Sequence, residues 1–64
     1  MKTPYQISKE NLKQISIWAK KRFSDDKPKI REIINNNAHS LCSEYSLSEK
    51  KQILLHNYAC KLHP

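Results

Sequence analysis

The residues of this sequence best suited to chemistry are its cysteines and histidines. His39 and Cys42 are followed by His56 and Cys60, so an H-x-x-C pair precedes an H-x-x-x-C pair. Cysteine thiolate and histidine imidazole are common zinc ligands, and two such pairs imitate the spacing of a structural zinc site. A cysteine with a histidine is also the minimum set for nucleophilic catalysis. Either chemistry requires that the elements carrying these residues bring them together.

Helix geometry argues against a shared metal site. The sequence predicts a turn near Ser46, which at 1.5 Å per residue places Cys42 and Cys60 roughly 15 Å apart along a helical hairpin. A disulfide needs Cα atoms within about 7 Å, so neither a four-ligand site nor a Cys42–Cys60 bridge is expected. His56, Cys60 and His63 share one face of the last predicted helix, which we interpret as the surface of a C-terminal turn. We therefore predict no metal and no cofactor.

Catalysis has little support in this sequence. The 64 residues contain no glycine, the residue on which phosphate-binding loops and nucleophile elbows depend. A chain of this length forms a single small domain, and no third group that would orient a Cys–His pair is evident. The sequence therefore predicts a protein that is not an enzyme.

The charge balance points to an anionic partner. Ten Lys and two Arg against six acids give a net charge of +6, which favours nucleic acid or an acidic protein face. The excess of Lys suits attraction to a phosphate backbone better than base readout, because Arg makes the bidentate contacts to guanine. No apolar run approaches the roughly 18 residues of a membrane span, and the N-terminus lacks the apolar core of a signal peptide. We expect a soluble cytoplasmic protein with no membrane partner.

Apolar residues recur at helical spacing along the whole chain. The pattern predicts an all-α fold with one domain, residues 1–64, and helices over roughly 8–24, 28–45 and 47–62. Short polar links between helices of this length favour a small three-helix antiparallel bundle, or a helical hairpin with a docked third helix.

Capping residues mark where these helices are expected to begin. Ser8 suits the N-cap of the first helix, although Pro4 preceded by Thr3 offers an earlier start. Ser46 and Glu49 form an S-x-x-E capping box, which we expect to open the third helix.

One arc of each helix is apolar and is expected to form the core. The members are Leu12, Ile15, Trp18, Ala19 and Phe23 in the first helix, Ile30, Ile33, Ile34, Leu41 and Tyr45 in the second, and Leu47, Leu54, Leu55, Tyr58, Ala59 and Leu62 in the third.

Three consecutive asparagines, Asn35 to Asn37, interrupt the second arc. Asn is a mediocre helix former, so one alternative breaks the helix here and yields four short helices with a helix-turn-helix. The apolar spacing continues through the triplet without a change of phase, and we therefore predict a continuous helix. In that helix Asn37 lies on the buried face, as a structural or self-pairing amide, while Asn35 and Asn36 face solvent or a partner.

The segment from Lys20 to Arg31 holds half of the cations at the first predicted link. We predict that it contacts phosphates, although Asp25 and Asp26 would partly neutralise it. Lys9 and Lys13 fall on the same stripe as Lys20 and extend the surface along the first helix. The predicted nucleic-acid-binding residues are Lys20, Lys21, Arg22, Lys27, Lys29 and Arg31.

Ile17, Cys42 and Ile53 lie outside the main arcs and suggest a second apolar surface. A monomer of this size can hardly bury such a surface, so we expect a homodimer or a protein partner.

Our leading interpretation is a small, basic, regulatory protein that binds DNA or RNA. The alternative is a protein-interaction module, an inhibitor or adaptor that docks on an acidic partner. In length and helical content the chain resembles small RNA-binding helical-hairpin regulators, a similarity of architecture alone.

Overall fold

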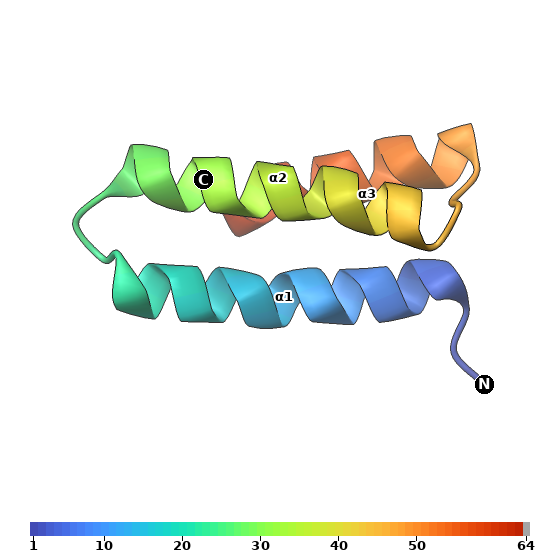
Figure 1. Cartoon of the computed structure of the whole chain (residues 1–64), viewed down its shortest axis with the longest axis horizontal. Coiled ribbons are helices and arrows are strands. Elements are labelled where there is room, and N and C mark those ends of the chain that lie inside the picture. Colours follow the sequence, from blue (N-terminus) through green and yellow to red (C-terminus); the bar gives the residue numbers. More distant parts are fainter. Residues whose placement is uncertain (64) are drawn as a thin grey trace.

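Three α-helices packed side by side make up the structure, a computed structural model that describes residues 1–63 (Figure 1). Helix α1 spans Pro4–Arg22, α2 spans Lys27–Glu44 and α3 spans Glu49–Leu62. Each helix contacts both of the others, and two short links reverse the chain, so that α1 and α3 run parallel and α2 runs against them. The predicted three-helix bundle is confirmed, as a rod of 34 × 21 × 17 Å. No helix among the described residues is long and apolar enough to cross a membrane.

Helix α1 begins one turn earlier than Ser8. The hydroxyl of Thr3 accepts a hydrogen bond from the Gln6 backbone N–H at 3.2 Å, and the Gln6 side chain accepts one from the Thr3 N–H at 2.9 Å. This capping box satisfies two N–H groups that the helix itself leaves free, and Pro4 follows it at the first helical position. Ser8 is not a cap and lies fully buried in the core.

The link between α2 and α3 is a Schellman motif, which corrects the predicted start of α3. Ser46 adopts a left-handed conformation with φ of 50°, its N–H donates to Ser43 O at 3.2 Å, and the Leu47 N–H donates to Cys42 O at 3.1 Å. Leu47 and Cys42 are both buried, as expected for the apolar contact of this motif. Because Ser46 ends α2 in this way, it cannot open α3, and Ser48 is the N-cap instead.

The core runs along the axis between the three helices. Leu12, Ile34 and Leu55, one from each helix, are completely buried. Most of the predicted arc residues are buried or half-buried around them, which confirms the apolar pattern. The core also contains five small residues: Ser8, Ser16, Ala19, Ala38 and Ala59.

Two predicted core residues, Trp18 and Leu54, are exposed to 55% and 39%. The reason for Trp18 is that α1 turns its smallest side chains inward, with Ser16 and Ala19 both buried. Trp18 is rotated by about 100° from Ala19 and by about 160° from Ser16 around the helix, so it lies outside the contact. In α3 the same shift buries Leu55 and leaves Leu54 beside it on the surface.

Helix α2 runs through the three asparagines without a break, so the continuous helix is confirmed. Asn35 and Asn36 are exposed, and Asn37 is half-buried. The Asn37 amide donates a hydrogen bond to the Ile33 carbonyl at 2.7 Å, within its own helix. This bond satisfies the amide locally and gives Asn37 a structural role.

We expect Asn35→Ala and Asn36→Ala each to raise the free energy of unfolding by about 0.5 kcal/mol, because both positions are exposed in a helix interior where Ala has the higher propensity. Urea titration of the single variants measures the effect. Thr3→Ala serves as a control of opposite sign and should lower stability by about 1 kcal/mol through loss of the cap. Destabilisation by either asparagine variant would contradict the continuous helix.

Candidate nucleic-acid interface

The six predicted nucleic-acid-binding cations gather at one end of the bundle. Lys20, Lys21 and Arg22 form the last turn of α1, and the other three lie in the first turns of α2. Only four residues, 23–26, separate these helices, so the chain reversal brings the two groups together (Figure 1). All six side chains are exposed. We refer to them as the link cluster: Lys20, Lys21, Arg22, Lys27, Lys29 and Arg31.

One part of the link cluster surrounds the end of α3. Lys20 and Lys27 line a shallow depression of about 320 Å³ together with His63. Lys27 and Arg31 line a neighbouring depression of about 520 Å³ that also includes His63 and the exposed Asn35. His63 Nε2 lies 2.9 Å from the Lys27 carbonyl oxygen, which ties the end of α3 to the start of α2. Side chains of α1 and α2, together with the residue that follows α3, therefore form this surface.

The other part of the link cluster lies beside Trp18, which the sequence had placed in the core. Trp18, Lys21 and Arg22 line a separate depression of about 280 Å³. The indole packs edge-on against the Phe23 ring, with centroids 6.0 Å apart and planes at 82°. The Arg22 guanidinium lies 5.9 Å from the centre of the same Phe23 ring. No sequence signal separates Trp18 from the core, because Ser16 is polar and only the structure shows that it is buried.

No cation of the link cluster forms an ion pair with a carboxylate among residues 1–63. Among residues 1–63, the ion pair between a cationic side chain and a carboxylate joins Lys2 and Glu10, with Nζ and Oε1 2.8 Å apart. It lies at the other end of α1 from the link cluster. Asp25 and Asp26, which are expected to offset the cluster partly, lie in the link beside it but form no ion pair with a described cation, and Glu32 lines the same depression as Lys27 and Arg31. Asp26 instead accepts a hydrogen bond from the Lys29 backbone N–H at 3.1 Å and caps α2.

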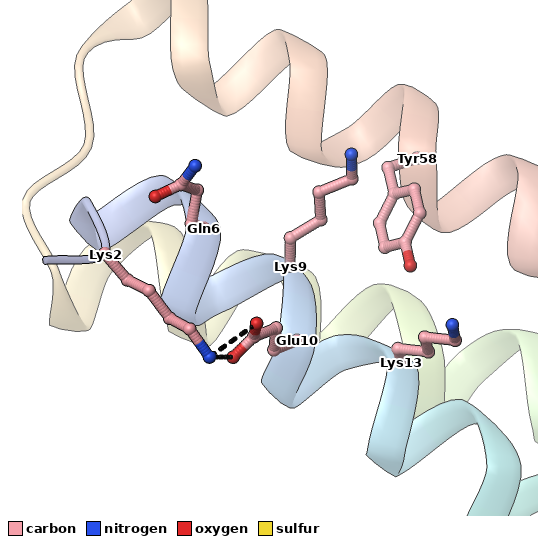
Figure 2. A pocket seen from close by; sticks show the side chains of 6 residues that line it. All are labelled: Lys2, Gln6, Lys9, Glu10, Lys13 and Tyr58. Carbon is pink, nitrogen blue, oxygen red and sulfur yellow. Dashed lines mark hydrogen bonds and ion pairs between the residues drawn. The ribbon is translucent and has the colours of Figure 1, made fainter.

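A second basic surface follows the groove between α1 and α3. Figure 2 shows Lys9 and Lys13 of α1 beside Tyr58 of α3, around a groove of about 400 Å³. The Lys9 ammonium lies 4.9 Å from the centre of the Tyr58 ring, a cation–π geometry. Lys51 of α3 lies at a similar distance, 4.8 Å, from the Tyr5 ring. The lysine stripe on α1 therefore leads from this groove towards Lys20 in the link cluster.

The predicted apolar interface is not formed as expected. Ile17 and Ile53 are exposed, to 52% and 56%, but Cys42 is only 4% exposed and belongs to the core. Cys42 was misplaced because α2 packs against two helices, and α3 covers the flank that a single buried arc leaves open. Ile17 lies in the C-terminal half of α1 and Ile53 near the start of α3, so the parallel helices hold them towards opposite ends of the bundle.

The residues of the H-x-x-C and H-x-x-x-C pairs are dispersed. Cys42 is buried, whereas Cys60, His39 and His56 are exposed, and both thiols are free. Across the described residues no group of three His, Cys, Asp or Glu side chains is placed to hold a metal ion. Burial raises the pKa of the Cys42 thiol above its ordinary value, because desolvation disfavours the thiolate.

Comparison with known proteins adds no relative. No protein family, no curated protein and no solved structure matches this chain.

The two cysteines should differ sharply in reactivity. In the native protein at pH 8, a disulfide reagent is expected to modify Cys60 rapidly, while Cys42 reacts only as the core opens, because it is buried and its raised pKa lowers the thiolate fraction. The absorbance of the released thiolate should rise in two phases, and urea should accelerate the slow one. Cys60→Ser should remove the fast phase alone. Two equally fast thiols would contradict the core position of Cys42.

Proposed function

We propose that this chain is a small, basic, non-enzymatic regulatory protein that binds nucleic acid through the link cluster. The observation that carries the proposal is the concentration of six exposed cations at one end of the bundle, none of them paired with a carboxylate among residues 1–63. A phosphate backbone is a dense line of negative charge, and each contact with it releases condensed counterions. Because no cation of the cluster is held in an ion pair among residues 1–63, each charged group remains free to contact a phosphate.

The lysine stripe of α1 gives this surface the length that an extended polyanion requires. From Lys9 through Lys13 to Lys20 the stripe covers about 16 Å of helix, at 1.5 Å per residue. It continues at Lys20 into the depression shared with Lys27. Lys dominates over Arg in the sequence, and this favours contacts to phosphates that tolerate many base sequences.

An acidic protein is the alternative partner, because the same cations would attract it. Specific protein interfaces combine charge with a central apolar or aromatic anchor, surrounded by a polar rim. Ile17 and Ile53, the exposed isoleucines, lie towards opposite ends of the bundle, and Cys42 is buried. The three residues expected to anchor a protein partner or a second copy therefore do not share one surface, and this set does not form the apolar centre of a protein interface.

Binding to duplex DNA and RNA at low salt is expected, with an affinity that falls steeply as salt is added. Each phosphate contact contributes about 0.9 to the slope of log K against log salt concentration for B-DNA. Lys27→Glu with Arg31→Glu removes two exposed cations of one depression, so the slope should become shallower by about 2. Fluorescence anisotropy of a labelled duplex across a salt series measures it.

The matched control is Lys50→Glu, compared with Lys27→Glu alone, because it makes the same change in net charge in the first turn of α3, at the other end of the bundle. Lys50→Glu should alter the slope much less than Lys27→Glu. Equal effects of the two single variants would show that binding follows net charge and not the link cluster. Absence of any binding to DNA or RNA at low salt would overturn the proposal in favour of an acidic protein partner.

A further inference from the structure

The tryptophan at the end of α1 has no role in the core and lies among cations. Its side chain is 55% exposed, although an indole has more apolar area to bury than any other side chain. Edge-on packing against Phe23 holds the ring, and Lys21 and Arg22 line the same depression. A fixed aromatic surface flanked by two cations is the combination with which proteins bind unpaired bases.

We infer that Trp18 is a stacking platform for an unstacked base, so that the preferred ligand of this chain is a single-stranded nucleic acid. The inference rests on the proposed function and names its substrate class. Lys21 and Arg22 contact the phosphates on either side of the stacked base, and the exposed indole takes the base itself. In a duplex the bases are paired and stacked on one another, so the ring finds no free face there.

The charge around Trp18 argues against a second copy of this chain as its occupant. A self-complementary contact centred on Trp18 would bring Lys21 and Arg22 of both copies together, with no carboxylate of residues 1–63 paired to either. Like charges in a shared interface oppose association. A polyanion removes this repulsion and covers the indole at the same time.

The chain has one tryptophan, so indole fluorescence reports on Trp18 alone. Titration with a 12-residue oligothymidine or oligouridine should quench the emission, since stacking does not read the sugar 2′-hydroxyl. An abasic oligomer with the same number of phosphates and a hairpin duplex should bind with little quenching. This measurement uses the unmodified chain, so it does not depend on how well a variant folds.

Trp18→Ala should weaken binding of the single strand about tenfold, as loss of one stacked base does, while the salt slope stays unchanged because the indole carries no charge. Trp18→Phe should retain part of the affinity. Ile17→Ala is the matched control, because Ile17 is the adjacent residue with a similar exposure of 52% and no ring. Circular dichroism and sedimentation of each variant verify its fold and its oligomeric state.

Each contrary result separates the two proposals. Salt-dependent binding with unchanged indole emission, and with Trp18→Ala equal to the wild type, would overturn the stacking platform and leave the proposed function intact. Equal losses for the duplex and the single strand would overturn the preference for unpaired bases. A dimer that Trp18→Ala converts to a monomer would assign the indole to an interface between copies and also overturn the inference. Absence of all nucleic-acid binding would end both proposals.

Discussion

The close approach of three helices along a single line of buried side chains is the constraint on which this structure depends. Leu12, Ile34 and Leu55 occupy that line, and on α1 their buried neighbours are small, as Ser16 and Ala19 are. A core of this size contributes only about 3–5 kcal/mol of net stability, so there is little free energy to offset a badly fitting side chain. The exclusion of Trp18 from the core, and the aromatic surface that results, follow from this narrow packing.

The concentration of positive charge adds a second constraint, which opposes the first. Unpaired cations at one end of a small bundle repel one another and weaken the compact state. A ligand that binds only the folded chain stabilises it by mass action, and a polyanion also removes this repulsion. Folding stability and ligand binding are therefore coupled through the link cluster.

The fold could be predicted from the sequence because its signals are local. Apolar spacing gave all three helices, and it carried the correct prediction through the asparagines of α2. The position of the link cluster could also be predicted from the sequence, because its residues are close in sequence on either side of one turn. The predicted exposure of Cys42 was wrong because it depends on tertiary packing. A helical wheel assumes one contact face, whereas α2 is covered from two sides and so buries Cys42. The contact between Lys9 and Tyr58 joins two helices that are far apart in the sequence, and no sequence pattern predicts it.

The parallel course of α1 and α3 fixes the field of the backbone at the link end. Two helices finish there and present the negative ends of their dipoles, while α2 alone begins there with its positive end. That positive end is already occupied by the chain's own carboxylate, Asp26, which accepts the Lys29 N–H. Main-chain dipoles therefore offer an incoming anion no net attraction at this end, and any anion held there depends on flexible side-chain charges alone.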